Sequence, residues 1–355
     1  MIPELGVIEG YFGEPWSHAD RLAVVGRLAP LGFGFFHFAP KADPFLRRRW
    51  REPHPAAALA DLAALSAHCR RHGLRFGVGL SPFELYHDYS GPAKADFLAK
   101  LRALDAIGLD DLAILFDDTR GDVADLAAKE AEIVHEAMAA TRATRVVMCP
   151  TYYSDDRMLD VVFGERPAGY LEDLGRRLDP RAGVYWTGEE ICAREICAGH
   201  LDRVAGALRR KPFLWDNYPV NDGPRMSRFL HLRAFTGRAA GGIADCVTAH
   251  ALNPALQPHL TLLPAATLAT TYREVSAYCY MRAFRDAARQ LAGPDLAGML
   301  EADLLYLQDL GIDHIGADRE RLRARYAAVN HPMAAEVVRF LDGAYTVDKW
   351  EGAAP

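Results

Sequence analysis

The stretch LAILFDDT, Leu112–Thr119, decides how this chain folds. Its first five residues are apolar, and Asp117 and Asp118 follow them directly. Such a run is typical of a strand that is buried on both faces within a parallel sheet. Ligands of barrels and open α/β sheets bind at the carboxyl ends of the strands, where a buried carboxylate is costly unless it is paired or used. The aspartate pair is therefore the leading candidate for chemistry.

Short apolar runs alternate with helical patterns along most of the chain. The expected strands are 5–9, 33–38, 75–80, 112–116, 145–148, 184–186, 213–215 and 243–248. The expected helices between them are 17–28, 56–72, 94–107, 123–140, 170–178, 199–209 and 226–232. This alternation predicts a parallel sheet with crossover helices, and eight strand runs favour a closed (β/α)₈ TIM barrel over an open doubly wound sheet.

Polar residues follow almost every expected strand, as a barrel with a ring of working groups requires. They are Glu9, Gly10, Lys41, Ser81, Asp117, Asp118, Thr151, Tyr153, Thr187, Asp216, Asn217 and Asn253. The phosphate-binding patterns of open sheets, GxGxxG after the first strand and GxxxxGK[ST], do not occur. We expect an α/β chain with a catalytic barrel over 1–257 and a small helical domain over 258–355, with helices at 265–291, 296–310, 319–329 and 334–341.

Composition limits the class of protein. The chain has 355 residues, of which 50% are apolar, so it can form a large core. A net charge of −6 argues against nucleic acids and anionic membranes as default partners. The chain shows neither a secretory signal pattern nor an apolar stretch of membrane-spanning length, and its six cysteines have no disulfide-framework spacing. We therefore expect a cytoplasmic protein with reduced thiols.

Two adjacent carboxylates favour one kind of glycoside chemistry. Neighbouring strand residues point to opposite faces, so Asp117 and Asp118 reach one pocket only where the chain has left the strand. They then approach from the same side, whereas a protein nucleophile and its acid must face each other across the sugar. The pair suits a substrate that supplies its own nucleophile, with one carboxylate positioning it and the other acting as acid and base. A helix-capping or salt-bridged pair, or a magnesium site, remains the alternative.

The stretch KPFLWDNYPVND, Lys211–Asp222, mixes flat apolar rings with planar polar groups. Sugars offer CH-rich faces that stack on aromatic rings and hydroxyls that need donors and acceptors. An aromatic corner with turn-forming Asn and Pro residues explains the same letters. Taken alone, this stretch leaves both interpretations open.

Eight motifs in order resemble one known family. They are GVIEGYFGEPW (6–16), FAPKAD (38–43), RRRWREP (47–53), FDDT (116–119), CPTYY (149–153), YWTG (185–188), WDNYPVND (215–222) and ALNP (251–254). Together they are similar to the catalytic domain of glycoside hydrolase family 84, the O-GlcNAcase and bacterial hyaluronidase-type N-acetylglucosaminidases, over about residues 5–270.

The resemblance implies removal of terminal β-linked N-acetylglucosamine from a glycoconjugate or glycosylated protein, with net retention and without metal or cofactor. In this family the acetamido oxygen attacks the anomeric carbon and forms an oxazoline. Carried over, Asp117 steers the acetamido N–H, and Asp118 protonates the leaving oxygen and later activates water. The other implied contacts are Tyr153 and Asn217 to the acetamido group, Trp215 as a wall, and the Gly10 carbonyl, Lys41, Asp222 and Asn253 to sugar hydroxyls.

Some positions depart from the family pattern. Tyr152 stands where many relatives have an acidic residue, and Gly223 stands where an aromatic residue is common. Thr119 and the stretch 81–84 also match only in part. These differences leave the natural leaving group open. A sugar-binding protein without catalysis and a metal-dependent barrel hydrolase are the alternative functions, and a homodimer is an open expectation.

Overall fold

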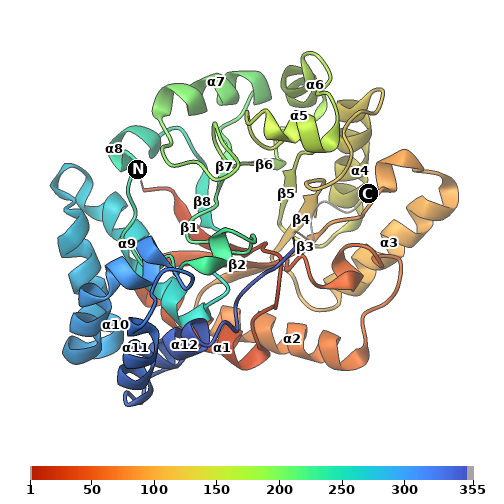
Figure 1. Cartoon of the computed structure of the whole chain (residues 1–355). Helices are drawn as coiled ribbons and strands as arrows, with labels where there is room; N and C mark the ends of the chain where they lie inside the picture. The colour runs from red at the N-terminus through yellow and green to blue at the C-terminus, as the bar shows by residue number, and fades with distance from the viewer. Residues whose placement is uncertain (1, 350–355) are drawn as a thin grey trace.

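The protein forms a closed barrel of eight parallel strands in the computed structural model, which describes residues 2–349 (Figure 1). The strands are β1 (Glu4–Glu9), β2 (Phe33–Phe38), β3 (Arg75–Leu80), β4 (Asp111–Leu115), β5 (Arg145–Cys149), β6 (Gly183–Trp186), β7 (Phe213–Asp216) and β8 (Ala249–Leu252). Each strand pairs with the next, and β8 pairs with β1. The predicted TIM barrel is confirmed.

Helices surround the barrel and connect its strands (Figure 1). They are α1 (His18–Leu31), α2 (Ala56–Arg71), α3 (Gly91–Asp105), α4 (Leu126–Ala140), α5 (Met158–Phe163), α6 (Tyr170–Arg177), α7 (Ala198–Leu208) and α8 (Ala240–Ile243). Apolar side chains of the helices and strands bury one another, and all five residues of β4 are buried. Burial on both faces explains why residues 112–115 of this strand are all apolar.

Two expected elements of the barrel are wrong. The eighth strand was expected at 243–248, but it is Ala249–Leu252, because Ile243 ends the short helix α8. His250 interrupts the apolar run AHAL, so an apolar pattern does not predict this strand. His250 is buried and contacts Asp216 and Tyr272. The helix expected at 226–232 is a single 3₁₀ turn, Met226–Arg228, followed by irregular chain.

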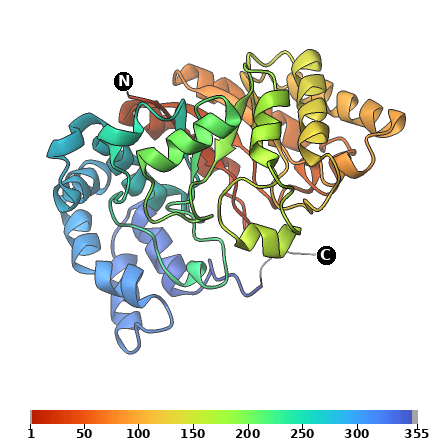
Figure 2. The same ribbon diagram turned by 90° about the horizontal axis from the view of Figure 1, so that it is seen from above.

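The chain after the barrel strands is helical and lies on one side of the molecule (Figure 2). Its helices are α9 (Pro258–Glu274), α10 (Tyr280–Ala302), α11 (Asp318–Ala327) and α12 (Pro332–Leu341). The helix expected at 265–291 is two helices, because the chain breaks after Glu274. Helix α9 follows β8 and packs on α1, so it helps to close the helical ring. The domain boundary at residue 257 stays a prediction.

Within residues 2–349, none of the helices combines the length and apolar character needed to span a membrane.

Candidate active site

A cavity of about 360 Å³ opens at the carboxyl end of the barrel. This volume lies near the lower end of the roughly 300–1,000 Å³ of small-ligand sites, which suits one sugar ring. The lining includes every residue that the sequence analysis assigned to the site, namely Gly10, Lys41, Asp117, Asp118, Tyr153, Trp215, Asn217, Asp222 and Asn253. The barrel thus brings together residues from six of its strand ends.

A backbone turn lets both aspartates face this cavity. Strand β4 ends at Leu115, and Asp118 has a φ of 60°, in the left-handed region that few non-glycine residues adopt. The hydroxyl of Thr119 donates to the Phe116 carbonyl at 2.5 Å and closes the turn. A guanidinium N–H of Arg47 donates to the Asp118 carbonyl at 3.3 Å. The turn removes the strand alternation that would have separated the two carboxylates.

The two carboxylates have different environments. Lys41 Nζ lies 2.5 Å from Asp117 Oδ2 and 3.5 Å from Asp118 Oδ2. Asp117 Oδ1 is buried and has no hydrogen-bond partner. Burial raises the pKa of Asp118; the negative charge of Asp117 raises it further, and Lys41 opposes the shift. Burial disfavours the Lys41 ammonium, but the two aspartates outweigh it and raise the pKa of Lys41.

Side chains from β7 and the loop after β8 form a fixed wall. The Asn217 side-chain oxygen accepts from Trp215 Nε1 at 2.9 Å and from Asn253 Nδ2 at 3.0 Å. Asn253 Oδ1 accepts from the Gly10 backbone N–H at 3.2 Å. A Cβ on Gly10 would lie only 2.3 Å from the Trp215 ring, so the close ring requires glycine there. One amide hydrogen of Asn217 bonds the Ile191 carbonyl, which leaves the other for a ligand.

A buried ion pair lies beneath that wall. Asp216 accepts two bonds from Arg238, at 2.6 and 2.8 Å, and also contacts His250 at 3.0 Å. Burial opposes the charged carboxylate, but Arg238 lowers the pKa of Asp216 to about 2. Arg238 also donates to the Ala193 and Arg194 carbonyls, so it ties the loop after β6 to β7. Asp216, which the sequence placed among the strand-end polar groups, supports the site without lining it.

Asp222 and Tyr153 complete the polar lining. Asp222 Oδ2 accepts from the Phe12 N–H at 2.7 Å, and burial raises the pKa of Asp222 to about 6. Burial also raises the pKa of the Tyr153 phenol well above its usual value, so this hydroxyl stays protonated.

The sequence analysis missed an apolar part of the lining. Phe12, Cys149, Met158, Leu159, Val162, Phe163, Ile191, Cys192, Val220 and Met226 also face the cavity, together with Thr187. Four of them belong to α5, a helix that the sequence analysis did not predict. The run MLDVVF was the available signal, since its apolar residues recur at helical spacing.

The departures from the family pattern lie outside the cavity. The Tyr152 hydroxyl donates to the Gly164 carbonyl at 2.7 Å, and its ring is fully buried against Tyr170. Gly223 lines a wider neighbouring groove, which shares Cys192, Asn217 and Met226 with the cavity. Neither residue removes a polar group from the aspartate pair.

In residues 2–349, no three His, Cys, Asp or Glu side chains are grouped so that they could hold a metal ion. None of the six cysteines forms a disulfide.

Comparison with known proteins places this geometry in a family. The family model described as β-N-acetylglucosaminidase matches residues 5–304. The chain belongs to this family. Its resemblance to glycoside hydrolase family 84, inferred from eight motifs, is thereby confirmed.

Two curated relatives of this β-N-acetylglucosaminidase family member are the protein O-GlcNAcases of Rattus norvegicus and Mus musculus. Each is 28% identical over 279 residues, which is 76% of this chain but 30% of that protein. The chain therefore spans about a third of the length of these relatives.

Two solved structures share the fold. A mutant of the Thermobaculum terrenum O-GlcNAc hydrolase superposes with a TM-score of 0.80 at 24% identity, covering 95% of this chain and 80% of that one. The structure of CpGH84B gives a TM-score of 0.77 at 20% identity, covering 96% and 66%. At 20–24% sequence identity, these two similarities support only the fold, namely the barrel and the helices that follow it.

Proposed function

We propose that this chain is a retaining exo-β-N-acetylglucosaminidase that removes terminal β-linked N-acetylglucosamine through an oxazoline intermediate. The observation that carries the proposal is the unequal aspartate pair: Asp117 has a buried oxygen without a partner, and Asp118 beside it has a raised pKa. A buried, unsatisfied acceptor is costly in the empty protein, and a substrate N–H removes that cost.

Asp117 is the positioning group in this mechanism. Its Oδ2 is fixed by Lys41, so its free Oδ1 has a defined direction and can accept the acetamido N–H. That bond turns the acetamido carbonyl oxygen toward the anomeric carbon and makes it more nucleophilic. Holding the two reacting atoms in contact supplies much of the rate enhancement.

Asp118 is the acid and then the base. The acetamido oxygen forms a bond to the anomeric carbon while the bond from that carbon to the leaving oxygen breaks, and Asp118 gives its proton to this oxygen. Water then attacks the anomeric carbon, its proton passes to Asp118, and the acetamido oxygen leaves. Two inversions give net retention. Burial and the negative charge of Asp117 raise the pKa of Asp118, so Asp118 keeps its proton to a higher pH than a free aspartate does.

The remaining residues hold the sugar. Tyr153 and the free amide hydrogen of Asn217 contact the acetamido group, and the Trp215 ring forms the wall. The Gly10 carbonyl, Lys41, Asp222 and Asn253 bind sugar hydroxyls. The chain would act on glycoconjugates or glycosylated proteins, in the cytoplasm. A homodimer remains a proposal.

The test is a turnover assay with fluorogenic N-acetylglucosamine, N-acetylgalactosamine and glucose glycosides side by side. We expect release from the N-acetylglucosaminide, and much slower release from the other two. Fluorination of the acetamido methyl group should lower the rate stepwise, because it weakens the nucleophile. A rate that does not respond to fluorination would contradict the neighbouring-group mechanism. Binding without turnover would favour the sugar-binding alternative, and loss of activity with a chelator would favour the metal-dependent one.

A further inference from the structure

Helix α5 carries an unusual amount of exposed apolar surface. Its residues Met158, Val161 and Val162 are 52%, 77% and 45% exposed. The other large apolar side chains exposed in the described part of the chain, Ile2, Val275 and Leu305, lie elsewhere. Figure 1 shows α5 between β5 and α6, outside the ring of strands. Clustered apolar exposure of this kind marks a contact site more often than scattered exposure does.

The exposed face of α5 is continuous with the active-site cavity. Met158 and Val162 are four residues apart, so they lie on one face of the helix, and both line the cavity that contains Asp118. Val161, the most exposed of the three, does not line it. Leu159 and Phe163 are buried and anchor the helix.

The position of α5 matches the side from which a leaving group departs. The proposed hydroxyl-binding residues follow β1, β2, β7 and β8, whereas Asp118 follows β4. Helix α5 follows β5, the direct neighbour of β4 in the barrel. Met158 and Val162 therefore line the cavity on a side of the barrel adjacent to the strand that carries Asp118. A leaving group that takes the proton of Asp118 would exit beside them if it departs on this side.

The chemistry of this wall favours an apolar leaving group. Met158 and Val162 offer no side-chain N–H or O–H, and Met226 and Val220, which also line the cavity, offer none either. A second sugar would place hydroxyls against this surface without hydrogen-bond partners, which is unfavourable. An aliphatic or aromatic side chain would bury apolar area there, and Met adapts its shape to different partners.

We propose that Met158 and Val162 form a leaving-group subsite that selects a polypeptide with an apolar side chain next to the glycosylated serine or threonine, in preference to a second sugar. This inference rests on the proposed function and names its substrate class.

The test compares three substrates that carry the same terminal N-acetylglucosamine: a glycosylated serine peptide with leucine flanks, the same peptide with glycine flanks, and the β1,4-linked disaccharide of N-acetylglucosamine. The two peptides have the same leaving oxygen, so their kcat/KM ratio reports the flanks alone. We expect the wild-type enzyme to favour the leucine-flanked peptide about tenfold or more over the other two, as burial of one or two aliphatic groups predicts.

The double variant Met158→Ser/Val162→Ser should lower this preference to about twofold or less. Val161→Ser, a matched change on the same helix outside the cavity, should keep the wild-type preference. Met158→Leu/Val162→Ile should keep it too, and its thermal midpoint together with that of the serine variant reports correct folding. An unchanged ratio in the serine double variant, an equal loss in Val161→Ser, or a wild-type preference for the disaccharide would overturn the subsite. Release from none of the substrates by the wild-type enzyme would overturn the proposed function as well.

Discussion

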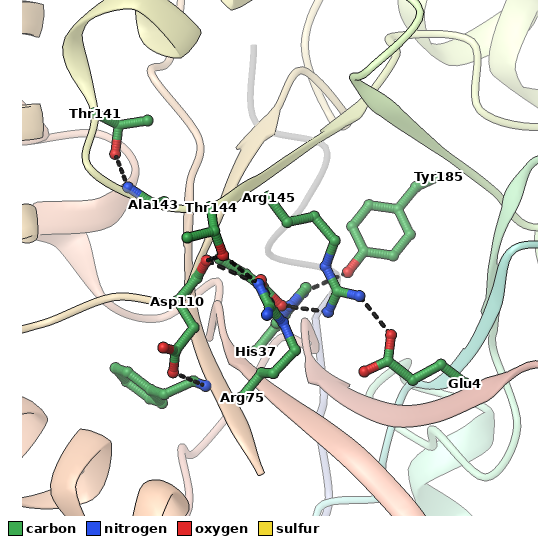
Figure 3. A network of polar contacts seen from close by, with 11 residues as sticks. Glu4, His37, Arg75, Asp110, Thr141, Ala143, Thr144, Arg145 and Tyr185 are labelled. Atoms are coloured by element: carbon green, nitrogen blue, oxygen red, sulfur yellow. Dashed lines mark hydrogen bonds and ion pairs between the residues drawn. The ribbon is translucent and has the colours of Figure 1, made fainter.

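The two ends of the barrel each bury aspartates beside cations, but they use them in opposite ways. At the amino end, Asp111 binds His37 at 2.9 Å and also Arg75 and Arg145. Figure 3 shows these three partners close together. Burial opposes the charged form of Asp111, but these partners outweigh it and lower its pKa. At the carboxyl end, Asp117 keeps an unpartnered oxygen, and the pKa of Asp118 is raised.

One neighbour of Asp111, His37, has both of its ring nitrogens bonded. Burial lowers the pKa of His37, so its ring is neutral; it donates to Asp111 and accepts from the Tyr185 hydroxyl at 2.6 Å. Arg145 also donates to Glu4, at 2.5 Å. Figure 3 shows these two side chains pointing toward each other. His37 is fully buried and is a core histidine. The comparison teaches that a buried carboxylate with all its bonds made stabilises the fold, whereas one with a bond left open is available for chemistry.

Removal of the acid at the carboxyl end should give the largest effect. Asp118→Asn should lower kcat about 10³-fold on a glycosylated serine peptide, because the serine oxygen leaves poorly without a proton. An activated phenol needs less protonation, so kcat on an aryl glycoside should fall much less. Steady-state kinetics with both substrates measure the difference. Equal losses would refute the acid role, and an unchanged thermal midpoint shows that the fold is retained.

The matched change at the amino end should affect stability instead. Asp111→Asn leaves Arg75 and Arg145 without their carboxylate, and we expect it to lower the free energy of unfolding by about 3 kcal/mol. Because the pKa of Asp111 is lowered, its stabilisation is present at neutral pH and is lost on acidification through the folded-state pKa. Urea unfolding at pH 7 measures the loss. Folded variant protein should keep its kcat within about twofold; a large drop in kcat would show that the two ends are not separable.

The structure of the barrel also explains which features could be predicted from the sequence. The first seven strands were predicted within two residues at each end, because apolar runs report burial directly. All nine predicted site residues line one cavity, since carboxyl ends of parallel strands meet on one side of a barrel. Their roles stay predictions.

Contacts between distant segments were not predictable from the sequence. Arg49 pairs with Glu52, its neighbour three residues along the chain, at 2.5 Å. Arg47 instead lies buried against the Asp118 carbonyl and the ring of Phe12, two partners that the local sequence does not reveal. His250 was likewise concealed, because its partners Asp216 and Tyr272 come from other elements.

The smallest expected effect is a change in pH dependence at Asp222, which lies between the two extremes of the comparison. This carboxylate accepts from the backbone N–H of Phe12, and burial raises its pKa to about 6. Above pH 6 it is charged and binds sugar hydroxyls with the stronger, charge-assisted bonds; below pH 6 it takes up a proton and binds them less well. Asp222→Asn is neutral at every pH. The wild-type enzyme should therefore exceed this variant several-fold in kcat/KM at pH 7.5, and the two should converge at pH 5. The readout is the ratio of the two kcat/KM values at each pH, because both enzymes keep Asp118. A ratio that stays constant across this range would mean that the charge of Asp222 serves the backbone of Phe12 and not the sugar.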